Sequence, residues 1–167
     1  MKQLRIFIAF ASDCEGERRI IRKICRSDEM IRTLCRELEV HLDCFDFKDV
    51  PSDAGRPQSL INSAVDRWKP DWFIFIFWGR LGCDAGLGMT GMEEEWNRAI
   101  NLNKEGGGHP RVSLYFNEAE GNPFDVNSVQ EEALEKFKTA VFSEYQALAT
   151  RFKGSREFSK QFRSDLH

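Results

Sequence analysis

Four short apolar runs along the chain predict the strands of a sheet. They span residues 4–10, 40–47, 72–78 and 112–116. The first, LRIFIAF, does not alternate strictly between apolar and polar residues, which is typical of a strand covered on both faces. The run at 72–78, WFIFIFW, is the most apolar and is expected at the centre of the sheet.

A helical pattern follows the first strand, from Cys14 to about Glu39. Apolar residues recur there at a spacing of three to four, with Arg, Lys and Glu between them. Ser12 or Asp13 is expected to cap the start of this helix. The polar triplet at 27–29 either interrupts the helix and restarts it or lies within it, and the pattern leaves both open.

Further helices are expected between and after the other strands, at 59–68, 92–103, 129–152 and 157–166. Residues 48–57 and 79–91 are expected to be loops, and the second of these carries five glycines. Strands alternating with helices predict a parallel sheet wrapped by helices. With right-handed crossovers, the simplest result is an α/β, flavodoxin-like three-layer sandwich with a four- to five-stranded parallel sheet.

The predicted domain comprises residues 1–152. Residues 153–167 are expected to be a C-terminal helical extension or the start of a linker to a downstream region, because the chain stops inside a helical pattern. The length of 167 residues suits one domain with a core of its own.

Composition indicates a globular protein of the cytoplasm. Hydrophobic residues make up 41% and the net charge is −3, with both signs interspersed. That balance argues against direct binding to nucleic acid or to a membrane surface, since either function usually requires a basic face. The five cysteines show no CxxC pairing, so we expect free thiols in a reducing compartment and no metal site. The first residues run straight into a strand pattern rather than a signal peptide.

A ligand cleft is expected where the strand order reverses, between the ends of the first and third strands. Residues 11–13 and 79–82 lie there, beside the segment 89–99. The glycine-rich loop is neither a Walker A sequence nor a GxGxxG turn, which disfavours the common nucleotide-binding loops. Arg80 is expected to meet a phosphate or carboxylate, or else to pair with Asp84 or an acid of the next helix. Trp78 is a candidate for stacking or for the core.

Three consecutive acids follow the loop, and helical phase separates them. A stripe of apolar positions defines the buried face, comprising Met92, Trp96, Ala99 and Ile100. Glu94 is then expected to point into solvent, whereas Glu93 and Glu95 flank the stripe. Either flanking acid could reach a cleft, or could simply be favoured by the dipole at the helix start.

Four motifs in order resemble a known family. They are FIAFASDCEGER, GRPQSLINSAVDRW, DWFIFIFWGRLG and TGMEEEWNRAI. Together, over about residues 4–117, they resemble the TIR-like domain of the DUF4062 type, found at the N-termini of STAND/NACHT-like proteins. Met92 and Cys83 depart from the family pattern, which usually has threonine at both positions.

The resemblance implies an enzyme that breaks the N-glycosidic bond of NAD+, by hydrolysis or cyclisation, in defence signalling. Glu95, four residues before Ala99, matches the catalytic glutamate of TIR domains and nucleoside deoxyribosyltransferases. The resemblance implies NAD+ or a related nucleotide as substrate and no cofactor. Phe10, Ala11 and Ser12 would line the nucleotide site and Arg80 would face the phosphates. The full set of substrate-binding candidates is Phe10, Ala11, Ser12, Asp13, Trp78, Gly79, Arg80 and Trp96.

Two other functions fit the same family. One is a non-catalytic module that self-associates, with the loop at 48–57 and helix faces as contacts. The other is an N-glycosidase acting on a nucleoside or nucleotide metabolite. Expected partners are further copies of the chain and the sensor or NTPase domains of a longer protein.

Overall fold

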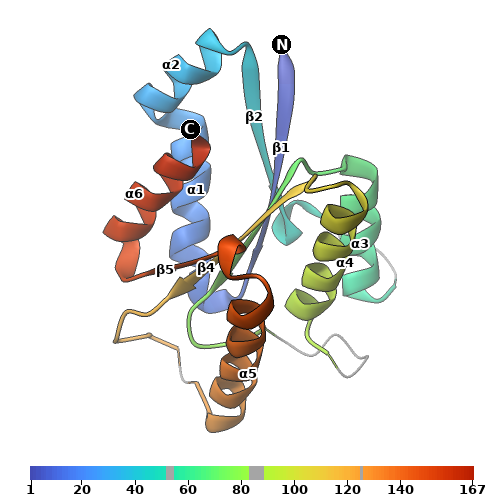
Figure 1. The fold of residues 1–167 in the computed structure, drawn as a ribbon, viewed down its shortest axis with the longest axis vertical. Coiled ribbons are helices and arrows are strands. Elements are labelled where there is room, and N and C mark those ends of the chain that lie inside the picture. The colour runs from blue at the N-terminus through green and yellow to red at the C-terminus, as the bar shows by residue number, and fades with distance from the viewer. Residues whose placement is uncertain (52–54, 83–88, 125) are drawn as a thin grey trace.

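The computed structural model describes residues 1–51, 55–82, 89–124 and 126–167. It contains a five-stranded parallel sheet in the order β2-β1-β3-β4-β5 (Figure 1). The strands are β1 (Lys2–Phe10), β2 (Val40–Asp46), β3 (Trp72–Phe77), β4 (Arg111–Asn117) and β5 (Ala149–Phe152). The all-parallel sheet, flanked by helices, confirms the expected flavodoxin-like three-layer fold.

Helices cover both faces of the sheet (Figure 1). One face carries α1 (Glu15–Ser27), α2 (Glu29–Glu37) and α6 (Gly154–Leu166), and the other carries α3 (Pro57–Trp68), α4 (Gly91–Glu105) and α5 (Ser128–Glu144). Short 3₁₀ turns lie at Ser12–Cys14, Phe47–Asp49 and Gln146–Leu148. No helix in the described part of the chain is long and apolar enough to cross a membrane.

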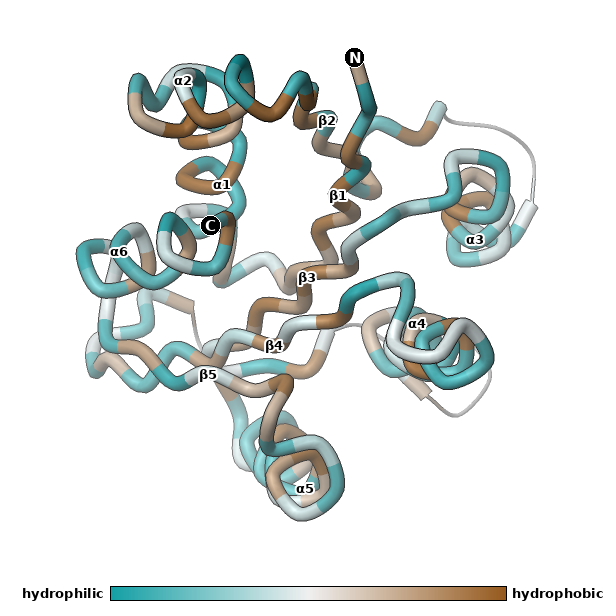
Figure 2. Tube along the Cα trace, turned by 45° about the horizontal axis from the view of Figure 1, so that its top comes forward, coloured by the Kyte–Doolittle hydropathy of each residue, from teal (hydrophilic) through white to brown (hydrophobic). Residues whose placement is uncertain are grey.

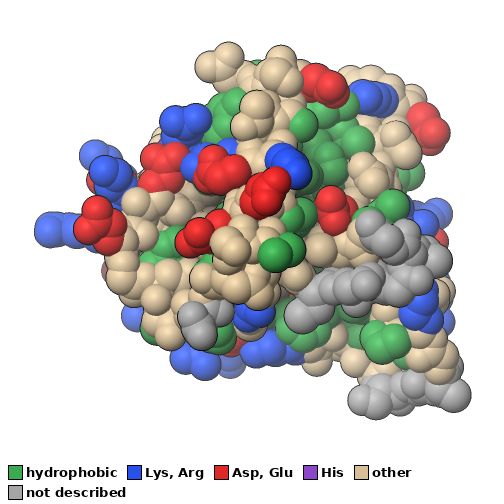
Figure 3. All heavy atoms as spheres, turned by 90° about the horizontal axis from the view of Figure 1, so that it is seen from below, with side chains coloured by type: hydrophobic (Ala, Val, Ile, Leu, Met, Phe, Trp, Pro, Cys, Tyr) green, Lys and Arg blue, Asp and Glu red, His purple; other side chains and the backbone are tan. Residues whose placement is uncertain are grey.

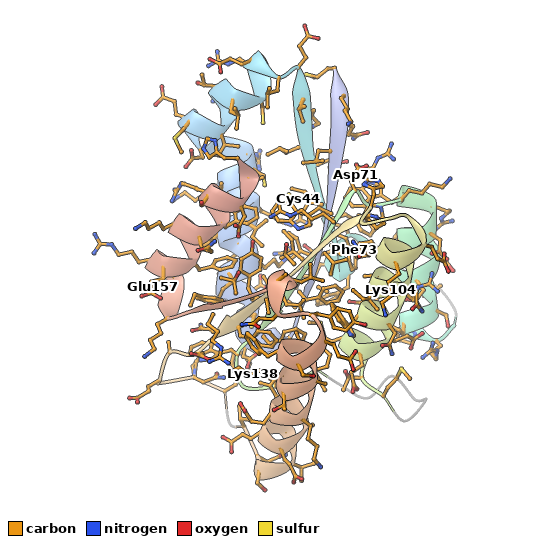
Figure 4. All side chains as sticks on the ribbon, viewed as in Figure 1. Cys44, Asp71, Phe73, Lys104, Lys138 and Glu157 are labelled. Atoms are coloured by element: carbon orange, nitrogen blue, oxygen red, sulfur yellow. The ribbon has the colours of Figure 1, made fainter. Side chains whose placement is uncertain are left out.

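The alternation of side chains along β3 divides the core in two. Phe73, Phe75 and Phe77 face α3, α4 and α5, whereas the intervening Trp72, Ile74 and Ile76 face α1 and α6. All six side chains are buried, and the strands form the hydrophobic centre of the trace in Figure 2. Phe73 lies between the sheet and its covering helices in Figure 4. A strand buried on both faces explains why this run has no polar positions.

Asp71 links β1 to the N-terminal ends of β3 and β4, at the edge away from the predicted cleft (Figure 4). Its backbone N–H donates to Arg5 O and its carboxylate accepts from Arg5 N, each at 2.9 Å. Its carbonyl accepts from Arg111 N at 2.9 Å. The loops at the opposite, C-terminal edge are therefore the ones available for a site.

The helical pattern at 14–39 forms two helices. Asp28 has extended backbone angles and its side chain accepts from Ile31 N at 3.3 Å, so it caps α2. The expected cap by Ser12 or Asp13 is wrong, because neither side chain caps the helix. Both instead bind the loop after β3, as described below.

The helix expected over 129–152 is wrong in its last third, residues 145–152. α5 ends at Glu144, and Ala149–Phe152 pairs with β4 as the fifth strand. Four residues are too few to show a clear strand pattern in the sequence, and this edge strand forms through its hydrogen bonds to β4.

The boundary expected at residue 152 falls between β5 and α6. Phe158 and Phe162 of α6 are fully buried, and Phe162 stacks on Trp72 of β3 at 5.8 Å.

Candidate functional site

A cavity of about 460 Å³ opens at the C-terminal end of β1, between the sheet and helices α3 and α4. Figure 3 shows the molecule from this end, where hydrophobic side chains are visible between charged groups. The cavity is lined by Phe7, Ile8, Ala9, Phe10, Ala11, Ser12, Phe47, Arg56, Pro57, Gln58, Ile61, Arg80, Gly82, Gly91, Met92 and Glu95. It lies at the switch point of the strand order, as the fold predicts.

Glu95 is a buried carboxylic acid at this cavity. It is 8% exposed, and its Oε1 accepts a hydrogen bond of 3.0 Å from Gln58 Nε2. Burial raises the pKa of Glu95 to about 7; the charge of Glu94 also raises this pKa, whereas the hydrogen bond from Gln58 lowers it. Glu95 can therefore change its charge near neutral pH, which is a property common among catalytic acids.

The other two acids of the triplet have structural partners. Glu93 and Thr90 form a capping box at the start of α4, with the Glu93 carboxylate accepting from Thr90 N at 2.7 Å. Glu94 receives two hydrogen bonds from Arg56, at 2.8 and 3.1 Å, which lower its pKa. The expectation that Glu94 points into solvent is wrong, because the start of α3 lies beside it and leaves its side chain only 14% exposed.

The buried stripe predicted on α4 is confirmed: Met92, Trp96, Ala99 and Ile100 are all buried. Helical phase placed these residues correctly because they face the sheet. It could not place Glu94, whose surroundings depend on a neighbouring helix.

Arg80 and Ser12 meet at the edge of the cavity. Arg80 Nη1 donates to Ser12 Oγ at 2.8 Å, and its guanidinium lies 5.9 Å from the centre of the Phe124 ring. The Nε atom of Arg80 is buried without a hydrogen-bond partner among the described residues. Asp84, an alternative partner for Arg80, lies outside the described residues. Among the residues that the structure describes, the hydrogen-bond acceptor of the Arg80 guanidinium is the Ser12 hydroxyl rather than a carboxylate.

Asp13 holds together the loops beneath this site rather than lining the cavity. The carboxylate is 4% exposed and accepts from Gly79 N at 2.9 Å and Asn122 Nδ2 at 3.0 Å. A Cβ on Gly79 would lie 2.6 Å from Asn122 Nδ2 and 2.9 Å from Val126 Cγ2, so a larger residue would require these side chains to move. Asp13 thus fixes the residue that precedes Arg80.

The predicted binding set is only partly brought together. Phe10, Ala11, Ser12, Arg80 and Glu95 line the cavity. Trp78 and Gly79 line a separate hollow, and the Trp78 indole donates to Ala119 O at 2.8 Å. Trp96 lies in the core, edge-on to Phe75 at 5.7 Å. Trp78, Gly79, Asp13 and Trp96 therefore do not contact the space beside Glu95.

The structure adds cavity residues that sequence reasoning did not select. Gln58 and Arg56 come from the start of α3, and Phe47, which is 42% exposed, lies over Phe10 with ring centres 5.1 Å apart. The only available signal for Gln58 was its place within the motif GRPQSLIN. Nothing in the local pattern indicated that the end of β2 would bring Phe47 to the same cavity.

The described residues contain no group of three His, Cys, Asp or Glu side chains suited to a metal ion. Cys14, Cys25, Cys35 and Cys44 are free thiols, and Cys83 lies outside the described residues. The cavity instead combines one buried carboxylic acid, one arginine without a described acidic partner, and apolar walls.

Comparison with family models found a match to "Domain of unknown function (DUF4062)" over residues 5–167. The chain belongs to the DUF4062 family. The family match runs from β1 to the end of α6, so it includes every element that lines the cavity. Searches of curated proteins and of solved structures found no match.

Proposed function

We propose that this DUF4062 domain cleaves the N-glycosidic bond of NAD+ or a related nucleotide, with Glu95 acting at the ribose. The observation that carries the proposal is the buried Glu95 carboxyl at the cavity. Among the described residues that line the cavity, it is the only acid. A volume of about 460 Å³ also falls within the range of small-molecule sites.

The chemistry requires one carboxylate. When the bond between ribose and nicotinamide breaks, the electron pair leaves with nicotinamide and the ribose becomes oxocarbenium-like. Ionised Glu95 would stabilise this positive charge, as a carboxylate does in glycoside hydrolysis. Attack by water, with loss of a proton, gives the hydrolysed product, whereas attack by a group of the same molecule gives a cyclic product.

The remaining cavity residues supply binding groups of suitable chemistry. Arg80 and Ser12 offer a positive charge and a hydroxyl to the phosphates. Phe47, which is 42% exposed and packs on the buried Phe10, offers aromatic surface to a planar base. A positively charged group at one side of the cavity and apolar walls elsewhere support a nucleotide as ligand over a neutral sugar.

The proposal extends to the setting of the enzyme. It includes three points: the domain is related to TIR domains, it acts in defence signalling in the cytoplasm, and it is activated by self-association within a longer protein. Clustering of several copies is therefore part of the test.

The test is incubation of NAD+ with the domain fused to a scaffold that clusters it, followed by mass spectrometry of the products. Wild-type protein is expected to release nicotinamide, and Glu95→Gln and Glu95→Ala are expected to lose turnover. Glu105→Gln, an exposed acid at the end of the same helix, is the matched control and keeps activity.

Retained turnover in both Glu95 variants would overturn the role of Glu95. Absence of NAD+ cleavage by clustered wild-type protein would overturn the proposed substrate. A parallel panel of nucleosides and nucleotides then tests metabolite cleavage, and measured self-association without any turnover favours the interaction module.

A further inference from the structure

Gln58 lies between the two helices that form one wall of the cavity. It is 7% exposed, near the start of α3, and its Nε2 donates to Glu95 Oε1 at 3.0 Å. The same Nε2 donates to Asn62 Oδ1 at 3.2 Å, one turn along α3. Both amide hydrogens of Gln58 are therefore used, and one of them goes to Glu95.

The orientation of the Gln58 amide follows from its neighbours. Asn62 Nδ2 donates to Glu94 Oε1 at 2.7 Å, and Glu94 is held by two hydrogen bonds from Arg56. An ionised carboxylate accepts but cannot donate, so the NH₂ of Asn62 must face Glu94 and its oxygen must face Gln58. The Asn62 oxygen in turn requires the NH₂ of Gln58 to face it. The chain of hydrogen bonds thus has one direction, which ends at Glu95.

Space for this arrangement exists because residue 91 is glycine. A Cβ at Gly91 would lie 2.4 Å from Gln58 Oε1, closer than atoms can approach without movement. Gly91 has no left-handed backbone angle that requires glycine. A Cβ at residue 91 would therefore displace the Gln58 amide from its present position.

We propose that Gln58 is the positioning residue of the site: its amide, oriented through Asn62 by Glu94 and admitted by Gly91, holds Glu95 Oε1 and leaves Oε2 to the ligand. This rests on the proposed function in assigning a ligand to Glu95. A hydrogen bond from an amide favours the charged carboxylate over the carboxylic acid. Gln58 therefore also keeps Glu95 ionisable in a site where burial acts against its charge.

The charged groups around Glu95 also influence its pKa. Glu94, on the same helix, opposes ionisation of Glu95. Arg56 and Arg80 line the same cavity from α3 and from the loop after β3. Because Arg56 and Glu94 are bonded to each other, replacing Gln58 alone leaves these charges in place.

The test measures the pKa of Glu95 directly, by ¹³C NMR of the glutamate side-chain carboxyl groups, with Glu95→Gln identifying the signal. Gln58→Met keeps the length of the side chain and removes both donors. It is expected to raise the pKa of Glu95 by about one unit above the wild-type value. Gly91→Ala, which displaces Gln58 without removing it, is expected to raise it in the same direction.

Gln161→Met is the matched control, because Gln161 donates to Asp165 on α6, away from the cavity. It is expected to leave the Glu95 pKa unchanged. In a turnover assay of Gln58→Met and Gly91→Ala, the pH at which kcat reaches half its maximum is expected to rise by the same number of pH units as the pKa of Glu95.

The variant to be judged is the one, Gln58→Met or Gly91→Ala, whose NMR spectrum otherwise matches the wild type. If the pKa of Glu95 in that variant stays at the wild-type value, the proposal is overturned. This readout does not depend on turnover. If the pKa moves but no nucleotide is cleaved, the positioning role stands and the proposed function fails. If NAD+ is cleaved through Glu95 but the pKa and pH profile do not move, the proposed function stands and the role of Gln58 fails.

Discussion

Replacing Glu95 with glutamine is expected to stabilise the domain at alkaline pH. The folded protein raises the pKa of Glu95 to about 7 from an ordinary value of 4.5, mainly through burial. The folded state therefore binds this proton more tightly than the unfolded state. Stability contributed by protonated Glu95 is fully present below pH 4.5 and is lost as the pH rises through 7.

The size of the effect follows from the interval between the two pKa values. At 1.36 kcal/mol for each pH unit, ionised Glu95 costs about 3 kcal/mol of unfolding free energy at pH 8. Glutamine has nearly the same shape, carries no charge and still presents an oxygen to Gln58. For a domain of this size, the gain corresponds to a melting temperature roughly 6–12 °C higher than that of the wild type at pH 8.

The assay is urea unfolding followed by tryptophan fluorescence, at pH 5 and pH 8, for wild type, Glu95→Gln and Glu105→Gln. Other acids also titrate in this range, so the quantity of interest is the difference between wild type and variant at each pH. We expect a small difference at pH 5 and about 3 kcal/mol in favour of Glu95→Gln at pH 8, with no such change for Glu105→Gln. An equal difference at both pH values would refute the reasoning.

Three further predictions concern the residues around the site. Asp13→Ala removes the acceptor of Gly79 N and Asn122 and is expected to lower the free energy of unfolding by about 1–3 kcal/mol, measured by urea denaturation; unchanged stability would contradict its role between the loops. Arg80→Met is expected to raise the KM for NAD+ about tenfold with a smaller effect on kcat, and an unchanged KM would remove the phosphate contact from the proposal. Phe158→Ala is expected to cost about 3–5 kcal/mol in thermal unfolding, because its ring is fully buried between α6 and the sheet, and a loss below 1 kcal/mol would indicate that α6 is a dispensable extension.

The hydrophobic pattern sufficed for the sheet and for most helices because burial follows local periodicity. The runs that form β1, β3 and β4 are apolar on both faces, which distinguishes them from surface strands. The pattern failed at β5, where four residues join the sheet through hydrogen bonds to β4. An edge strand of this length is defined by its partner, and the partner is more than thirty residues away in sequence.

The candidate site divides in the same way. The switch-point rule brought Ser12 and Arg80 together correctly, and their side chains are hydrogen-bonded. It placed Gly79 at the same point, yet Gly79 borders a different hollow, together with the stacking candidate Trp78. Asp13, expected at a helix cap, instead binds backbone and side-chain donors from loops 66 and 109 residues away.

The sequence alone determined the parallel α/β fold, the switch point and the buried stripe on α4, because each follows from the order and periodicity of apolar residues. Tertiary structure alone decided the surroundings of the three acids. Glu93 caps its helix, Glu94 pairs with Arg56, and Glu95 is buried against Gln58 at the cavity. These environments depend on how α3 packs beside α4, and no local pattern within α4 contains that contact.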